Sequence, residues 1–314
     1  MQINQANLAA LYKGYRTFFL DALHAAAPLW QGIAMKVPSN SAEELHHWLG
    51  SIPGMRKLVG EVVIQNLAAS NYSIKNDEFE STIGVKQADI ERDSYGIYNP
   101  LFQAMGLTAA QHPDELVANL LVNGFSTKDY TGKNFFDSNK KAQSNARAVY
   151  SNVDTKKLNS ANFEAARTNL KSRLNAMGRP MGLGRDLVLV VSPKNESTAR
   201  TILQADFIQQ SVASGGTSAV GGVTNVNKGT ARFVVWPQLA VASADDMWFL
   251  YDAGYPIKPF IFQEEKAVMF ASLTNPDDDH VFKKHEFLYQ AYGRYNAGYG
   301  LAELTYGSDG TTGP

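Results

Sequence analysis

The stretch WFLYDAGYPIKPFIFQEEKAVMF, Trp248–Phe270, places two strand-like apolar segments on either side of a turn that contains glycine and proline. We expect one strand around Trp248 and a second over FIFQEEKAVMF. Within the second strand, Glu264 and Glu265 are neighbours, so their side chains point to opposite faces. These two carboxylates are therefore poor candidates for a paired catalytic acid and base.

The region upstream of this stretch mixes helix and strand patterns. DLVLVVS, Asp186–Ser192, is a continuous apolar run that predicts a buried central strand. Helices are expected on either side of it, over Phe163–Met177 and Asn195–Leu203. SVASGGTSAVGGVTNVNKG, Ser211–Gly229, is rich in glycine, serine and threonine and predicts a surface loop, after which ARFVVW resumes the strand pattern.

The N-terminal segment Asn7–Ala26 has apolar residues at helical spacing, which predicts an amphipathic helix. Its apolar face leaves two interpretations open. The helix packs on the core of its own chain, or it is an arm that docks on a neighbouring subunit. The residues of the candidate arm contact are Leu8, Leu11, Tyr12, Tyr15, Phe18 and Phe19.

Two more helices are predicted in the first half of the chain. Ser41–Leu49 begins with a capping serine and two glutamates, and Asn99–Asn123 is interrupted by Pro113 and stops at Gly124. The adjacent pair His46-His47 does not suggest a metal site, because neighbouring helical side chains point about 100° apart.

Between these helices, Val62–Arg92 has a strand pattern. Its FESTIGVKQ segment alternates apolar and polar side chains. The stretch is too polar to fill a core alone, so we predict a long hairpin that protrudes from the body. The residues expected to make contacts on this extended loop are Lys75, Phe79, Ile83 and Lys86.

The overall composition indicates a globular protein without thiol chemistry. The 314 residues are 44% hydrophobic and 19% charged, with a formal net charge of −1 and no cysteine. The charge gives no support for a dedicated nucleic-acid binder, and the absence of cysteine excludes disulfides and thiolate zinc sites. No signal peptide or membrane-spanning run is recognisable, so we expect a soluble protein made in the cytoplasm.

Motifs for catalysis or cofactor binding find little support. Gly178, Gly182 and Gly184 precede a strand, whereas dinucleotide-binding glycines follow one. The carboxylates of NPDDDHVFKKHE, Asn275–Glu286, lack the spacing and glycine of a calcium loop and indicate a solvated turn. We therefore expect no enzyme, no cofactor and no metal.

The last quarter of the chain resembles the Mu-like phage major head subunit family. The resemblance rests on the opening stretch together with FLYQAYGRYNAGYGLAELTYGS, Phe287–Ser308. The matching positions are Trp248, Pro259, Gln263, Arg294, Asn296, Gly298, Tyr299, Gly300 and Tyr306. Ala161–Leu203 also resembles a helix, buried strand and turn of tailed-phage capsid proteins, and the likeness extends over about two-thirds of the chain.

One further segment, YTGKNFFDSNKK, Tyr130–Lys141, resembles a turn and strand of the same family. It matches at Thr131-Gly132 and at Phe135-Phe136-Asp137, and it has Asn139 near the position where the family usually has histidine. We predict that Phe135 and Phe136 form a short strand that pins the spine helix to the C-terminal strands.

The resemblance implies an α+β fold, the tailed-phage major capsid protein fold, with its parts in a defined order. Residues 1–60 would be the N-terminal arm, 61–97 the extended hairpin loop, and 98–185 the peripheral domain with its spine helix. Residues 186–254 would be the axial domain, and 255–314 the strands that return to the peripheral domain.

The implied function is that of a major capsid protein, a virion component assembled in the host cytoplasm. It would form hexamers and pentamers of an icosahedral shell around double-stranded DNA. Expected partners are a scaffolding protein, a portal protein, a cement or decoration protein and nonspecifically contacted DNA, with no membrane. Alternatives are a tail or connector component and an α+β metabolite-binding protein or enzyme. Lys75 and Lys86 could serve lysine cross-links, although solvated lysines explain them as well.

Overall fold

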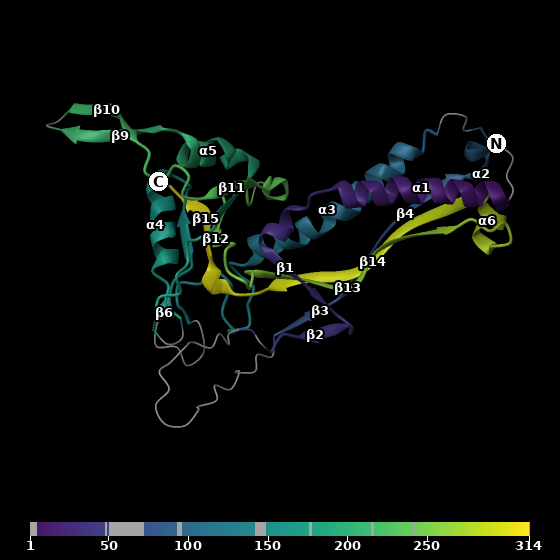
Figure 1. Cartoon of the computed structure of the whole chain (residues 1–314), viewed down its shortest axis with the longest axis horizontal. Helices are drawn as coiled ribbons and strands as arrows, with labels where there is room; N and C mark the ends of the chain where they lie inside the picture. The colour runs from purple at the N-terminus through teal and green to yellow at the C-terminus, as the bar shows by residue number, and fades with distance from the viewer. Residues whose placement is uncertain are drawn as a thin grey trace, which may run out of the picture.

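The computed structural model describes residues 5–47, 49, 72–92, 96–141, 149–175, 178–214, 217–241 and 243–313. Residues 61–71 of the predicted extended loop and residues 50–60 of the predicted arm lie outside these ranges. The described part is built around two large sheets, each covered by helices, that meet in an angled, elongated molecule (Figure 1).

The first sheet has four strands in the order β1-β13-β14-β4. β1 is parallel to β13, and the other neighbours are antiparallel. Helices α1 and α3 run along this sheet (Figure 1). The bounds of these elements are α1 Gln5–Ala25, β1 Ala34–Pro38, β4 Asp77–Lys86, α3 Asn99–Asn123, β13 Phe260–Leu273 and β14 Glu286–Tyr299.

The second sheet has five strands in the order β11-β8-β12-β15-β7. Helices α4 and α5 lie beside it at the other end of the molecule (Figure 1). The bounds are β7 Val153–Lys156, α4 Ser160–Lys171, β8 Leu187–Val191, α5 Glu196–Gln204, β11 Arg232–Val235, β12 Trp248–Asp252 and β15 Thr305–Thr312.

The remaining elements are short strand pairs and single helical turns. β2 pairs with β3, β5 with β6, and β9 with β10, which project from the second sheet (Figure 1). Their bounds are β2 Glu43–Leu45, β3 Ser73–Lys75, β5 Lys140–Lys141, β6 Val149–Tyr150, β9 Phe207–Ser214 and β10 Thr217–Thr224. The short helices are α2 Gln87–Arg92, α6 Asp279–Lys284, η1 Leu29–Gly32, η2 Pro193–Asn195, η3 Pro237–Leu239 and η4 Ala302–Leu304.

Several predicted elements are present, and the sequence features that predicted them have the expected role in the structure. β8 is buried along its whole length, as its unbroken apolar run predicts. α4 begins where the Asn159 side chain accepts a hydrogen bond from the amide of Asn162, 2.7 Å away. α3 spans the predicted range and ends before Gly124, but it continues through the buried Pro113 without the expected interruption.

Helix α1 packs on its own chain, in a core at the far end of the first sheet. Leu8, Tyr15 and Phe19 are buried there with aromatic residues of α3, β13 and β14. The Tyr15 ring stacks on Phe102 with centroids 4.2 Å apart. Gly106 of α3 permits the close approach of the two helices, because a Cβ there would lie 2.3 Å from the Phe19 carbonyl oxygen.

The structure corrects three local predictions. Residues 43–45, within the predicted helix Ser41–Leu49, form strand β2, since they pair with β3. Ser211–Gly229 is not an irregular loop, because β9 and β10 pair in register over most of it. β4 does not protrude as a hairpin: it is the edge strand of the first sheet, paired with β14 along its length.

The sheets also cross the predicted domain boundaries. The five-stranded sheet, which corresponds to the predicted axial domain 186–254, takes β7 from the range 98–185 and β15 from the range 255–314. The predicted boundaries missed this mixing of segments within one sheet, because pairing between distant segments leaves no local pattern in the sequence.

Candidate functional site: the junction of the two sheets

The two sheets meet around the segment from Gly124 to Lys140, which we name the junction segment. It follows the spine helix α3 directly and ends in β5. Its two phenylalanines are fully enclosed: Phe135 is 0% exposed and Phe136 is 2% exposed. They do not form the predicted strand; they lie in a bend of irregular backbone.

Phe135 faces the four-stranded sheet. Its ring stacks on Tyr299 of β14 with centroids 4.5 Å apart and an interplanar angle of 21°. It also lies 5.2 Å from the ring of Phe260, the first residue of β13. The hydroxyl of Tyr299 in turn donates a hydrogen bond to the carbonyl of Leu120 in α3, 3.0 Å away. Phe135 thus connects the returning strands to the spine helix.

Phe136 faces the five-stranded sheet. Its ring lies 5.5 Å from Phe249 of β12 and 4.8 Å from Phe125. Two glycines make room for it: a Cβ at Gly124 or at Gly307 would lie 2.8 Å from the ring. The amide of Phe136 also donates to the carbonyl of Gly124 (2.9 Å). Adjacent residues therefore bind opposite sheets, which fixes the sheets relative to one another.

A buried ion pair lies next to Phe135, with the Lys140 nitrogen 5.6 Å from the centre of its ring. The Lys140 ammonium contacts Oδ2 of Asp129, and both side chains are 0% exposed. Lys140 also donates to the carbonyls of Asn134 (2.9 Å) and Phe135 (3.2 Å). Burial lowers the pKa of Lys140, and the neighbouring Asp129 charge opposes this shift.

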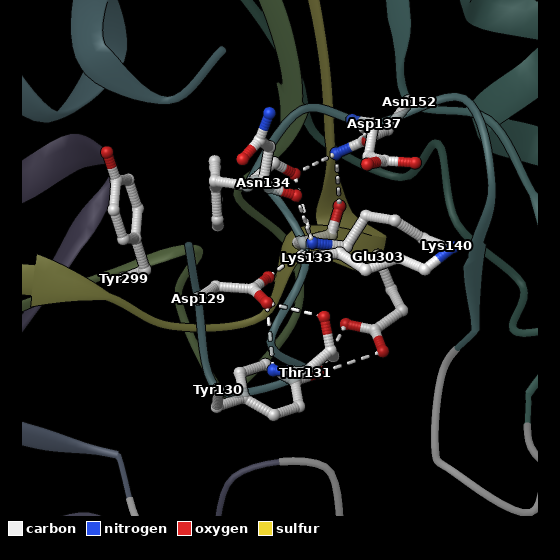
Figure 2. Close-up of polar contacts among 12 residues, drawn as sticks. Asp129, Tyr130, Thr131, Lys133, Asn134, Asp137, Lys140, Asn152, Tyr299 and Glu303 are labelled. Carbon is white, nitrogen blue, oxygen red and sulfur yellow. Dashed lines mark hydrogen bonds and ion pairs between the residues drawn. The ribbon is translucent and has the colours of Figure 1, made fainter. Parts of the chain in front are cut away.

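A second buried carboxyl group, that of Glu303, lies next to the pair (Figure 2). The Tyr130 hydroxyl donates to it, at 3.0 Å from one oxygen and 3.2 Å from the other. Burial raises the pKa of Glu303 to about 7. Arg173, also buried, donates to the backbone carbonyl of Glu303 (2.8 Å), which ties the segment just after α4 to the turn before β15. The junction is therefore held by polar contacts as well as by aromatic packing.

The sequence reasoning found the two phenylalanines but missed the polar residues around them. These are Asp129, Lys140, Asn152, Arg173 and Glu303, which are all buried. The signal was present in the quoted segment, where charged and turn-forming residues flank an apolar pair. Asp129 and Lys140 are only 11 positions apart, but nothing in the segment shows that they are enclosed, and Asn152, Arg173 and Glu303 lie outside the segment.

Gln263 and Asn296, two residues of the C-terminal strands that match the family, hold β3 and the start of β4 in place beside β13 and β14. The buried Gln263 amide donates to the Ile74 carbonyl (3.0 Å) and to Oδ1 of Asn76 (2.9 Å), and its oxygen lies 3.0 Å from Nε2 of His46. Asn296 donates to the carbonyl of Lys75 (2.8 Å). These contacts give a physical reason for amide side chains at the two matching positions.

The predicted contact residues of the arm and extended loop fall into two groups. Leu8, Tyr15 and Phe19 are buried in the chain's own core, which agrees with the first of the two interpretations of that helix. Leu11, Tyr12 and Phe18 are half-buried.

On β3 and β4 the predicted contacts are similarly divided. Phe79 stacks on Tyr295 with centroids 5.0 Å apart, and Ile83 packs against the core under α1. Lys75 and Lys86 are exposed. A role of any of these residues between subunits stays a prediction.

Comparison with known proteins identifies the chain. The family described as Mu-like prophage major head subunit gpT matches residues 8–157, 153–239 and 240–312. The chain belongs to this family. The major capsid protein of Escherichia phage Mu is 30% identical over 304 residues, covering 97% of this chain and 74% of that protein. The Mu-like prophage FluMu major head subunit of Haemophilus influenzae is 28% identical over 301 residues, covering 96% and 72%.

Solved structures agree with this assignment. The subunit in the procapsid of bacteriophage JBD30 is 28% identical with a TM-score of 0.58, covering 98% of this chain and 76% of that chain. The mature capsid of bacteriophage PhiM1 shares the fold at 12% identity with a TM-score of 0.58, covering 90% and 87%. The tailed-phage capsid fold and the assignment as a major capsid protein of a Mu-like phage are thereby confirmed.

Two negative findings apply to the described residues only. None of their helices is long and apolar enough to cross a membrane. Among the same residues, no group of three or more histidine, aspartate or glutamate side chains could hold a metal ion.

Proposed function

We propose that this major head subunit self-assembles as hexamers and pentamers into an icosahedral shell that encloses double-stranded phage DNA. The observation that carries the proposal is the family match along nearly the whole chain to subunits of such heads. The junction supports it physically. A subunit that occupies non-identical positions needs a body that keeps its shape, so that differences between positions are absorbed by its extensions.

We assign the parts of the molecule as follows. The four-stranded sheet with α3 is the peripheral domain, and the five-stranded sheet with α4 and α5 is the axial domain at the centre of the capsomer. The predicted arm and extended-loop residues remain candidates for contacts between subunits. For the arm, the half-buried Leu11, Tyr12 and Phe18 are better placed than the three buried residues.

Exposed apolar side chains at the ends of the molecule support association. Phe282 of α6 is 73% exposed, and Phe207 at the base of the β9–β10 hairpin is 67% exposed. We propose that each of these rings is covered by a neighbouring subunit in the shell. Many such weak contacts per subunit make the loss of one subunit from a closed shell difficult, because they must break together.

The proposed partners follow from the role in a phage head. They are a scaffolding protein and a portal protein during assembly in the host cytoplasm, a cement or decoration protein, and DNA contacted without sequence specificity. A capsid of bacteriophage JBD30 is decorated with minor capsid protein trimers, which supports the decoration partner. We assign no catalytic turnover, because the relatives are structural capsid proteins.

The test is negative-stain electron microscopy of the purified protein after gel filtration, with and without its scaffolding partner. Closed shells, or capsomers with fivefold and sixfold outlines, are expected. A protein that stays monomeric or dimeric under both conditions would contradict the assembly proposal.

A further inference from the structure

The Lys140–Asp129 pair has an arrangement that is unusual for a structural ion pair. Both side chains are 0% exposed, and the lysine nitrogen contacts Oδ2 of the aspartate. Asp129 lies within the junction segment and Lys140 ends it, 11 positions later, so the contact closes a ring of backbone that contains Phe135 and Phe136. An amine and a carboxyl group held in contact and closed off from bulk solvent are the two reactants of an amide bond.

The two oxygens of Asp129 differ in their partners. Oδ1 accepts a hydrogen bond from the amide of Thr131 (2.9 Å) and another from the Thr131 hydroxyl (2.5 Å). Oδ2 faces the lysine nitrogen. Two donors fixed on one oxygen stabilise negative charge that would develop there when a nucleophile adds to the carboxyl carbon. The geometry therefore marks Oδ1 as the oxygen that stays and Oδ2 as the oxygen that leaves.

The surroundings of the pair favour the uncharged form of the lysine. Burial lowers the pKa of Lys140, which makes the nucleophilic free amine more accessible. The carboxyl group of Glu303, whose pKa burial raises to about 7, lies beside the pair and is hydrogen-bonded by Tyr130 (Figure 2). In its protonated form Glu303 adds no second negative charge to the site.

We propose that Lys140 and Asp129 condense to an isopeptide bond within the chain. The Lys140 nitrogen forms a bond to the Asp129 carboxyl carbon, and the bond from that carbon to Oδ2 breaks. Two hydrogens of the ammonium group leave with Oδ2 as one water molecule. The ion pair and the product amide plus water contain the same atoms, and no oxidant, reductant or other reactant is consumed.

The hydrogen bonds of the site remain satisfied after this reaction. The lysine nitrogen now donates to Asn134 and Phe135 carbonyls, whereas an amide nitrogen keeps a single hydrogen. The Phe135 carbonyl already accepts a second hydrogen bond from the Asn152 side chain (2.8 Å). The one remaining hydrogen can therefore serve Asn134, and no buried acceptor is left without a donor.

Such a bond would strengthen the junction of the two sheets. A chain without cysteine has no disulfide to hold this segment closed, whereas an isopeptide bond does so by other chemistry. The inference goes beyond shell formation and holds whether or not the isolated chain assembles.

The test is the intact mass of the full-length protein, measured by mass spectrometry under denaturing conditions on the soluble and on the shell-assembled form. The wild-type protein should weigh one water molecule less than its sequence. Tryptic cleavage after Lys133 should leave fragments 129–133 and 134–141 joined through the side chains. Fragment ions from two amino termini distinguish this branched product from an uncleaved linear peptide.

Matched variants separate the proposed bond from other losses of water. Lys140→Arg and Asp129→Ala should each keep the full mass of their own sequence, whereas Asp137→Asn, a change in the same segment, should still lose one water. A wild-type protein at full sequence mass in both forms would overturn the proposal. So would a loss that persists in Lys140→Arg, as a cyclic imide at Asp309-Gly310 would produce. The branched wild-type peptide decides the matter if a variant fails to fold.

Discussion

Replacing Phe136 by alanine should weaken the junction more than any exposed aromatic substitution. Phe136 is 2% exposed and lies between Phe249 and the glycines at 124 and 307. Truncation of a buried phenylalanine to alanine costs roughly 3–5 kcal/mol. For a chain of this length we expect the melting temperature to fall by roughly 5–8 °C. Phe282→Ala is the matched control, because that ring is 73% exposed, and its change should stay within about 0.5 kcal/mol.

A double-mutant cycle tests the packing more sharply than the single change. A Cβ at Gly307 would lie 2.8 Å from the Phe136 ring, so Gly307→Ala should destabilise the wild-type protein. In the Phe136→Ala background the same methyl group fills part of the cavity, and its cost should shrink or change sign. Urea unfolding of the dissociated subunit gives all four free energies. Additive effects, or a Phe136→Ala variant as stable as wild type, would refute the assignment of this ring as a structural pin.

Three further predictions follow from buried contacts. Glu303 has a folded-state pKa of about 7 against an ordinary value of 4.5, so the folded protein holds a proton there that the unfolded chain releases. The free energy of unfolding should fall as the pH rises from about 4.5 to about 7, and urea titrations at several pH values measure this dependence. Glu303→Gln should remove this contribution to the pH dependence. The same pH dependence in the variant and the wild-type protein would contradict the prediction. Gly106→Val should force α1 away from α3 at the Phe19 carbonyl and lower the free energy of unfolding by roughly 1–3 kcal/mol. Limited proteolysis should then cut α1 faster than in the wild-type protein. An unchanged rate of cleavage would count against the observed packing. Gln263→Leu leaves buried acceptors, including the Asn76 side-chain oxygen, without donors, at a cost of roughly 1–3 kcal/mol. Hydrogen exchange of the β3 amides should therefore accelerate. Unchanged protection in β3 would show that the Gln263 amide is not needed.

The sequence was sufficient for elements whose pattern is local. The spine helix α3 has its stop signal at Gly124, and β8 is an unbroken apolar run, so both were predictable from their own residues. The fold class and the family came from the order of motifs in the C-terminal strands. Phe135 and Phe136 were predictable as buried, because adjacent large apolar side chains in a polar loop require a partner.

The remaining features depend on contacts between distant segments. β4 was predicted to protrude because it is polar, but an edge strand buries only part of its surface and can be polar and still pair with β14. β9 and β10 contain the glycine, serine and threonine of a loop but pair with each other in register. Lys140 and Asp129 look like solvated residues in the sequence, and only the fold shows that both are enclosed.

A high-resolution electron cryomicroscopy reconstruction of the assembled shell tests the rigid-body view of this subunit most directly, because it shows the same chain in hexameric and pentameric positions. We expect the junction segment, with Phe135, Phe136 and the Lys140–Asp129 contact, to superpose in all positions. The differences should lie in α1, the β9–β10 hairpin and the other extensions. Particles that do not close, or sheets that rotate against each other at Phe135 and Phe136 between positions, would contradict this view.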